Sequence, residues 1–429
     1  MLSSIKNIKI PKDPFLLFAP FLLLYIVVAI IFPTNSFKGD ETRYLIYTDY
    51  LVTGNHIPDF DYLGNGPGYS IILIPFVALH LPLICITILN AFFYYFSIVL
   101  LFKIIFRITS FRKALICCCF LACYVNLYEW VPLIDPELFC LFLVSLLIFC
   151  LFNSFENQNF SKKYIFLAGF IIGFIALTKP IFGYVLLSMI IGIGILWIIN
   201  RKFYNYRKGL IILFVALATI TPYLIYTYHL TGKIFYLSSF GGNNLYWITT
   251  PYKGEYGDWS RDVKQNSSSG TNISILNIHE ELIKSNHQKD YETINKFSGV
   301  QQDEVFKRIA INNITSHPTK FLFNCICNLG RILFNTPYSY TLQTPKTLLR
   351  LPFNGVITVL LILCLFPTFK NWKKINFSIR FMLFFTLFYL GGSILGSAET
   401  AMFSVIVPVL LVWIAYIIQK TIKVKDWTN

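Results

Sequence analysis

Two acids and an arginine stand close together near the start of the chain, in the stretch "FKGDETRYLIYTDY" from Phe37 to Tyr50. A carboxylate such as Asp40 can remove a proton from a hydroxyl group while that hydroxyl attacks a sugar carbon. Arg43 follows Asp40 by three residues, so the two side chains share a face if the stretch is helical. An arginine there can hold and neutralise a departing phosphate. The stretch therefore contains a candidate base and a candidate phosphate ligand.

Further ionisable residues stand at the ends of other apolar runs. "LIDPELF" contains Asp135 and Glu137, "LTKPIFGY" contains Lys179, and "AETAMF" contains Glu399. Each also has an ordinary structural explanation, because an acid can cap or favour the start of a helix and a lysine can extend to the lipid headgroups. Charge at the edge of a membrane is nevertheless costly unless it is paired or solvated, and it commonly marks a working site.

The composition predicts a polytopic α-helical membrane protein. Of the 429 residues, 55% are hydrophobic and only 13% are charged. The mean hydropathy is +0.61. Apolar runs of about 18 or more residues recur, and each is long enough to cross the hydrocarbon core. The 10 cysteines form no CxxC pair and no Cys/His cluster, so no metal site is predicted from them.

The apolar runs give ten candidate spans. They are residues 14–33, 84–106, 114–131, 136–155, 164–180, 181–199, 210–228, 350–369, 378–396 and 401–419. The segment "GYSIILIPFVALHLPL" at 68–83 is interrupted by Pro75, His80 and Pro82, so we predict an interfacial helix there. The fold class is therefore an all-α bundle of about 10–12 transmembrane helices with interfacial helices in the first outer loop and one long outer loop.

Lysine and arginine clusters assign the two sides of the membrane. If the N-terminus is cytoplasmic, every later short inner loop carries basic residues. These residues include Lys103, Arg107, Arg112, Lys113, Lys162, Lys163, Arg201, Lys202, Arg207, Lys208, Lys370, Lys373, Lys374, Lys420, Lys423 and Lys425. The net charge of +15 thus indicates inner loops against an anionic leaflet, not nucleic-acid binding. We predict cytoplasmic termini, a bacterial inner membrane and a candidate site on the outer, periplasmic side.

Three regions follow from this topology. Residues 1–228 form an N-terminal transmembrane catalytic module with a first outer loop at about 34–83, residues 229–349 form a long outer loop, and residues 350–429 form the C-terminal transmembrane helices. The long loop is rich in aromatic residues, including Tyr246 and Trp247. Aromatic rings suit sugar faces and membrane interfaces alike, so both explanations stay open.

The order of these motifs resembles the GT-C membrane glycosyltransferases that use polyprenyl-phosphate sugars, in the branch of protein O-mannosyltransferases and lipid A aminoarabinose transferases. In that family an Asp-Glu motif follows the first helix, as in "GDETRY", and a Pro-Gly/Leu-Tyr segment closes the first loop, as in "GNGPGYSIILIPF". An Asp-Pro motif opens a later helix, as in "LIDPELFCLFLV", and "LTK" ends the next. A His-Pro element follows the long loop, as in "ITSHPTKFLF". The similarity covers nearly the whole chain.

The resemblance implies a hexosyl- or pentosyltransferase with a GT-C fold, a single inverting displacement and release of polyprenyl phosphate. Asp40 would be the general base for a lipid, glycan or protein acceptor. The other implied residues are Glu41 and Asp135 for catalysis, Arg43, Lys179 and Arg331 for the donor phosphate, and Glu137, Tyr69, Glu399, Tyr246, Trp247 and His317 around the substrate cavity. No cofactor is firmly implied, although a divalent cation can act in such a site.

Two positions depart from the family pattern. The aminoarabinose transferase branch has Glu-Lys before the proline of its first-loop segment, whereas Asn65 and Gly66 stand there in this chain. A phosphate-binding lysine is therefore missing. The last helix of the family often begins with E-x-R-Y, whereas this chain keeps Glu399 but has Ala401 in place of the arginine. Donor-phosphate binding must then depend on the other basic residues named above.

Two alternative functions fit the composition. A transporter or flippase of lipid-linked sugars would also have many spans, but transporters place ionisable groups near the bilayer midplane of repeated halves. The apolar runs here carry almost no charge at their centres and show no convincing internal repeat. A non-catalytic family member would share the same composition and topology.

Overall fold

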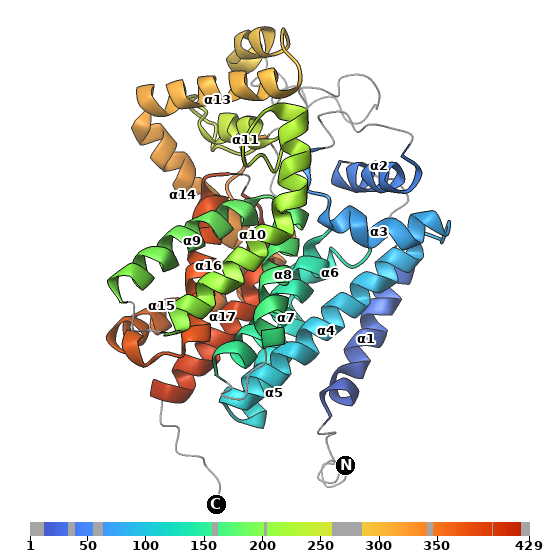
Figure 1. Cartoon of the computed structure of the whole chain (residues 1–429), viewed down its shortest axis with the longest axis vertical. Helices are drawn as coiled ribbons and strands as arrows, with labels where there is room; N and C mark the ends of the chain where they lie inside the picture. The colour runs from blue at the N-terminus through green and yellow to red at the C-terminus, as the bar shows by residue number, and fades with distance from the viewer. Residues whose placement is uncertain are drawn as a thin grey trace, which may run out of the picture.

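The computed structural model describes residues 13–32, 39–54, 63–156, 162–200, 204–259, 285–340, 346–396 and 398–421. Within these ranges the regular secondary structure is helical, and no strand is present. The predicted all-α class is therefore confirmed. Figure 1 shows a bundle of long helices beneath a layer of shorter ones.

Eight helices in the described part of the chain are long and apolar enough to cross a membrane, as expected for a multi-pass membrane protein. They are α1 (Pro14–Ile31), α4 (Ile84–Ile108), α7 (Glu137–Phe155), α9 (Ile181–Ile199), α10 (Tyr204–Thr231), α15 (Lys346–Lys370), α16 (Phe377–Ile394) and α17 (Thr400–Thr421). A further predicted span corresponds to α8 (Lys162–Thr178), whose 17 residues extend about 26 Å. α8 packs along α10 and α7 and so belongs to the bundle.

The predicted span at 114–131 is wrong, because the helix there is broken. α5 (Phe111–Ala122) has 12 residues, and the single turn α6 (Val125–Tyr128) follows. Carbonyl groups freed by a break within a membrane need new partners. The Tyr94 hydroxyl donates to the Leu121 carbonyl at 2.6 Å, and the Tyr25 hydroxyl donates to the Ala122 carbonyl at 2.8 Å. Tyrosines of neighbouring helices therefore satisfy the end of α5.

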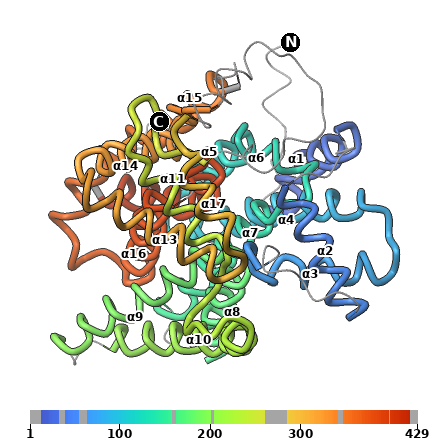
Figure 2. Tube along the Cα trace, turned by 90° about the horizontal axis from the view of Figure 1, so that it is seen from above, coloured from blue at the N-terminus to red at the C-terminus, as the bar shows by residue number. Residues whose placement is uncertain are grey.

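Two short helices lie between α1 and α4, in the segment where interfacial helices were predicted. α2 (Asp40–Thr53) begins with two acids, which suit the positive end of a helix. α3 (Gly68–Ala78) has 11 residues, too few to cross the hydrocarbon core. Figure 2, seen from above, places α2 and α3 beside α1 and α4 on one side of the molecule.

A second layer of shorter helices, here called the cap, lies between α10 and α15 in the chain. It comprises α11 (Gly241–Ile248), a helical segment at 285–294, α13 (Gly299–Ser316) and α14 (Pro318–Phe334). Tyr246, Trp247, Ile294, Val305, Phe306 and Tyr340 form its own apolar core. Figures 1 and 2 show the cap on the other half of the bundle from α2 and α3.

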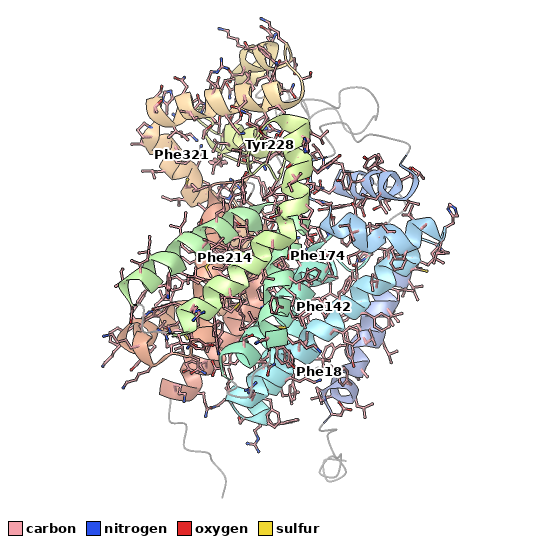
Figure 3. The ribbon with its side chains drawn as sticks, viewed as in Figure 1. Phe18, Phe142, Phe174, Phe214, Tyr228 and Phe321 are labelled. Carbon is pink, nitrogen blue, oxygen red and sulfur yellow. The ribbon has the colours of Figure 1, made fainter. Side chains whose placement is uncertain are left out.

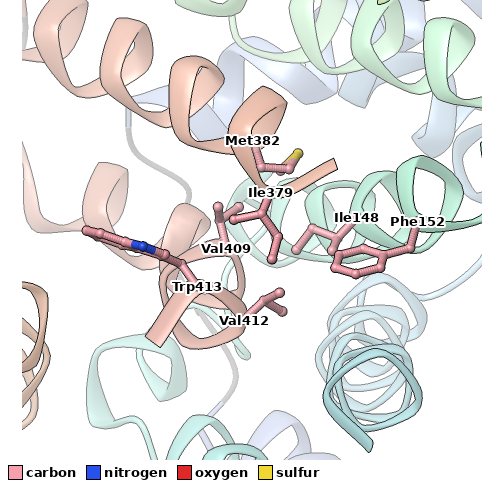
Figure 4. Close-up of a pocket in the computed structure, with 7 residues that line it drawn as sticks. All are labelled: Ile148, Phe152, Ile379, Met382, Val409, Val412 and Trp413. Carbon is pink, nitrogen blue, oxygen red and sulfur yellow. The ribbon is translucent and has the colours of Figure 1, made fainter. Parts of the chain in front are cut away.

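The bundle is built around α7 and α17, which pack against each other. Of their most apolar windows, 78% and 89% of residues are buried, against 17% for α1 and α15 at the periphery. A cavity of about 10 Å³ lies between α7, α16 and α17, where Ile148 and Trp413 are among the apolar residues around it (Figure 4). That volume barely accommodates one water molecule, so this cavity is a packing void and not a substrate site.

The outer surface of the bundle suits lipid. Phe214 and Tyr228, labelled in Figure 3, lie on α10 and are 54% and 50% exposed. Figure 1 shows that α1 begins and α17 ends on the lower side, where the turn between α4 and α5 also lies, whereas α2, α11 and α13 lie at the top. The division of the chain into three regions at 228 and 349 stays a prediction.

Candidate active site

The two acids that open α2 have different surroundings. Glu41 is buried, and its Oε1 atom accepts a hydrogen bond from the Ile134 backbone N–H at 3.0 Å. The side chain of Asp40 is 48% exposed and forms an ion pair with Arg43. The bond from Glu41 therefore attaches α2 to the loop before α7, whereas the neighbouring Asp40 is half exposed beside Arg43.

Arg43 lies at the edge of this region. Its guanidinium carbon lies 4.9 Å from the centroid of the Phe240 ring, immediately before α11. A guanidinium over an aromatic face keeps its in-plane N–H groups available for an anion. The guanidinium of Arg43 thus reaches from α2 to Phe240 at the start of the cap, and Asp40 lies beside it.

Three other carboxyl groups influence the pKa of Asp135, which stands just before α7. Burial raises the pKa of the Asp135 carboxyl well above its ordinary value, and the charge of Glu137 raises it further. Glu41 and Glu399 add smaller effects in the same direction, and Lys179 opposes them. The structure therefore brings these predicted site residues together from four separate parts of the sequence.

Lys179 is the cation at the centre of this group. Its Nζ atom lies 2.5 Å from Oε1 of Glu137. Burial by itself would lower the pKa of the Lys179 ammonium, but the neighbouring Glu137 carboxylate raises it above the ordinary lysine value. Lys179 is therefore charged at neutral pH, and most of its charge is balanced by Glu137.

The first outer loop approaches α8 too closely for a side chain at Gly66. A Cβ atom on Gly66 would overlap the backbone carbonyl of Leu177, and one on Gly68 would lie 2.5 Å from Oγ1 of Thr178. The lysine that the aminoarabinose branch has at this point therefore has no space here. Asn65 stands beside it, and its buried Nδ2 atom has no hydrogen-bond partner among the described residues.

Tyr69 and Tyr389 complete the surroundings of the Glu137–Lys179 pair. Tyr69, predicted for the cavity, is buried on α3 and lies within electrostatic range of Asp135 and Glu137. Tyr389, on α16, lies within range of Lys179 and Glu137. Sequence reasoning missed Tyr389 because it lies in an apolar span without any motif.

Arg350 is a second residue that the sequence did not indicate. Its guanidinium pairs with Glu129 after α6 and donates to Oγ1 of Thr400 at 3.1 Å. It therefore reaches the start of α17, beside the position at which Ala401 replaces the arginine of the family pattern. Arg350 lies in α15, far in the sequence from position 401 in α17. No sequence motif around position 401 could therefore include it.

The remaining predicted residues belong to the cap. The Tyr246 hydroxyl lies 2.5 Å from Nδ1 of His287 and donates to Oδ2 of Asp290 at 2.9 Å. Trp247 is buried beside it in the cap core, and His317 is exposed between α13 and α14. The structure does not place these three side chains in contact with the carboxylate group around Asp135.

Arg331, on α14 of the cap, is fully buried. Its guanidinium donates to the carbonyl oxygens of Pro337 at 2.7 Å and Tyr256 at 3.0 Å, and it also bonds to Asn328. The guanidinium carbon lies 5.8 Å from the centroid of the Tyr338 ring. These contacts engage both terminal nitrogens of the guanidinium, whereas its buried Nε atom has no hydrogen-bond partner among the described residues.

No divalent-cation site is evident in the part of the chain that the structure describes. Within those residues, no group of three or more His, Cys, Asp or Glu side chains is arranged to hold a metal ion. Among the carboxyl groups around Asp135, Glu137 pairs with Lys179.

A family model for dolichyl-phosphate-mannose-protein mannosyltransferases matches residues 70–226 of the chain. The match begins in α3 and ends in α10, and it includes Asp135, Glu137 and Lys179. It confirms the predicted resemblance to the protein O-mannosyltransferase branch over this segment.

Comparison with whole proteins gives weaker similarity. A search of curated proteins finds no significant match. Two solved structures of ArnT from Cupriavidus metallidurans, one bound to undecaprenyl phosphate and one in the apo state, align over 95% of this chain and 77% of theirs, with 11% sequence identity and a TM-score of 0.41.

Proposed function

We propose that this protein is an integral membrane glycosyltransferase of the GT-C type. It moves a hexose or pentose from a polyprenyl-phosphate donor to a hydroxyl or phosphate of a lipid, glycan or protein acceptor. The observation that carries the proposal is the first turn of α2, where the exposed Asp40 pairs with Arg43 while Glu41 is bonded to the loop before α7. The family match at 70–226 supports the same reaction class.

In this reaction the Asp40 carboxylate acts as the general base. It takes the proton of the acceptor hydroxyl as the acceptor oxygen forms a bond to the anomeric carbon of the donor sugar. The bond between that carbon and the phosphate oxygen breaks, and its electron pair leaves with the phosphate. The products are the glycosylated acceptor with an inverted anomeric centre and free polyprenyl phosphate. If the acceptor is already an anionic phosphate, no proton transfer is needed.

Arg43 serves best as the ligand of the departing phosphate. Its guanidinium lies against Phe240 at the partly exposed edge of α2, where its partner Asp40 is 48% exposed. Lys179 and Arg331 serve this role less well, because Glu137 balances the former and backbone carbonyls occupy the latter. Charge added to the phosphate as the bond breaks is stabilised by a bidentate guanidinium.

The reaction takes place on the outer, periplasmic face of a bacterial inner membrane. The basis is the positive-inside pattern, which puts the lysine-rich inner loops and both termini in the cytoplasm. Arg107 at the end of α4 and Arg112 at the start of α5 flank a turn, and this turn lies on the opposite side of the bundle from α2 (Figure 1). The lipid tail of the donor lies along the bundle, and the acceptor arrives from the periplasm.

The test compares two acids of the same helix. Asp40→Asn is expected to lower sugar transfer by a factor of about 10² to 10⁴ without a change in melting temperature, because the side chain is half exposed. Asp49→Asn, also exposed on α2, is the matched control and keeps full activity. The assay follows label from polyprenyl-phosphate sugars into acceptor and the appearance of free polyprenyl phosphate. Full transfer by Asp40→Asn would remove Asp40 as the base.

The same assay separates transfer from transport. A flippase would move the labelled lipid between leaflets of a proteoliposome and leave the sugar attached to it. Only a transferase is expected to release free polyprenyl phosphate together with labelled acceptor, without hydrolysis of the donor to free sugar. If the assay detects neither sugar transfer nor movement of the lipid, the protein is a non-catalytic family member.

A further inference from the structure

Three buried polar groups around Glu137 and Lys179 have no hydrogen-bond partner among the described residues. They are Oε2 of Glu137, the hydroxyl of Tyr69 and the hydroxyl of Tyr389. Glu137 is 6% exposed, Tyr69 1% and Tyr389 0%. Buried polar atoms of a folded protein are nearly always paired, so three unpaired groups in one place make it a candidate binding site.

Ring contacts hold the two tyrosines at this place. The Tyr389 ring stacks on Phe182 with centroids 4.3 Å apart, and the Phe182 N–H donates to the carbonyl of Lys179 at 3.0 Å. The Tyr69 ring lies 6.2 Å from that of Phe139, two residues after Glu137 in α7. Tyr69 on α3 lies within electrostatic range of Glu137, and Tyr389 on α16 lies within range of both Glu137 and Lys179. Ring packing fixes both positions.

The chemistry of these groups selects the ligand. The free oxygen of Glu137 only accepts hydrogen bonds, the Lys179 ammonium only donates them, and each tyrosine hydroxyl does both. A hydroxyl group of a sugar can donate to the Glu137 oxygen while it accepts from a tyrosine or from Lys179. A phosphate at neutral pH accepts hydrogen bonds and is negatively charged, so it cannot donate to the free oxygen of Glu137 and is repelled by that carboxylate.

We infer that Glu137, Tyr69 and Tyr389, together with Lys179, form a subsite that binds hydroxyl groups of the donor sugar. This inference rests on the proposed glycosyltransferase function and adds Tyr389 to it as a specificity-determining residue. It also changes the role of Lys179, which here binds sugar hydroxyls and holds Glu137 in place. The phosphate of the same donor then lies nearer to Arg43.

The experiment measures binding of two lipids that differ only in the sugar. The probes are undecaprenyl phosphate and a set of undecaprenyl-phosphate sugars carrying mannose, glucose or an aminopentose, bound to the full-length protein in lipid nanodiscs. The wild-type protein is expected to bind at least one glycosylated lipid more tightly than the bare lipid. Tyr389→Phe keeps the stack on Phe182, and it is expected to weaken binding of that lipid about 10-fold while leaving bare undecaprenyl phosphate unchanged.

Two further variants sharpen the result. Tyr69→Phe is expected to reproduce the selective loss. Tyr25→Phe removes a buried hydroxyl that donates to the Ala122 carbonyl at 2.8 Å, so it is expected to lower the melting temperature and to leave the affinity ratio of the two lipids unchanged. An equal effect of Tyr389→Phe on both lipids, or none on the glycosylated one, overturns the subsite. Failure of the wild-type protein to bind either lipid instead overturns the proposed function on which the subsite rests.

Discussion

The Nζ atom of Lys179 lies 2.5 Å from Oε1 of Glu137, although the two residues are 42 positions apart in the chain. The pair joins the turn between α8 and α9 to the first residue of α7. The Asp135 carboxyl lies within electrostatic range of this pair and of Glu41 and Glu399. Because Glu137 already balances the charge of Lys179, the pair suits the binding of hydroxyl groups better than the binding of phosphate, for which we propose Arg43.

Removal of one partner of this pair is expected to destabilise the protein. Lys179→Met leaves Glu137 as an uncompensated buried charge, which costs on the order of 3–5 kcal/mol. The double variant Lys179→Met with Glu137→Gln removes both charges and is expected to recover most of that loss. Thermal unfolding in detergent or nanodiscs measures both.

Lys163→Met is the matched control for this prediction. Lys163 lies at the exposed, opposite end of α8, so its replacement is expected to change the melting temperature little. A Lys179→Met protein as stable as the control would show that the pair contributes nothing to folding.

Asp135 is expected to make stability depend on pH. Burial and the charge of Glu137 raise the pKa of Asp135 in the folded state, so the folded state holds this proton more tightly than the unfolded chain does. The contribution of this proton to the free energy of unfolding is full below the ordinary aspartate pKa of about 3.9, and it is lost as the pH rises toward the raised pKa of the folded state. Asp135→Asn carries no charge at any pH, so it is expected to melt higher than wild type at pH 7 and equally near pH 4.

The control for Asp135 is Asp49→Asn, which removes an exposed carboxylate from α2. It is expected to show no such gain at pH 7. If Asp135→Asn melts lower than wild type at neutral pH, the ionised carboxylate stabilises the fold and the sign of its assigned effect is wrong.

Gly66 is expected to tolerate no side chain. Its replacement by alanine forces the first outer loop away from the Leu177 carbonyl at the end of α8, at a cost on the order of 1–3 kcal/mol. Gly355→Ala, in α15, is the control because nothing lies within 4 Å of its Cβ position. That change is expected to be neutral or to stabilise the helix by up to about 1 kcal/mol. Equal melting temperatures for the two variants would contradict the close approach.

The sequence predicted the helical class, the short α3 and the candidate acids at the helix ends, because apolar run length and charge position are local properties. It could not show that Glu41 is buried while its neighbour Asp40 is exposed, since that difference depends on the backbone N–H of Ile134, 93 residues away. The break after α5 was hidden for a similar reason. The apolar run continues through it, and the carbonyl groups are satisfied by Tyr25 and Tyr94 of other helices.

The site itself was predicted in part. Asp135, Glu137 and Lys179 belong to motifs and come together in the structure. Tyr389 and Arg350 belong to no motif, and only the packing of α16 and α15 brings them near the same region.

The two arginines proposed at first for the donor phosphate are expected to respond differently to mutation. Arg331→Lys loses the planar fork that bonds to the Pro337 and Tyr256 carbonyls, and a single ammonium cannot replace it. We expect this variant to lose about 2 kcal/mol or more of stability while the folded fraction keeps its KM for the donor lipid. Arg43→Ala, at the half-buried edge beside Asp40, is expected to keep its melting temperature and to raise the donor KM at least 10-fold. Melting curves and donor titrations on the same preparations make the comparison. An Arg331→Lys protein of normal stability with a raised donor KM would instead assign the phosphate to Arg331, because only a residue that contacts the donor changes its KM without loosening the cap.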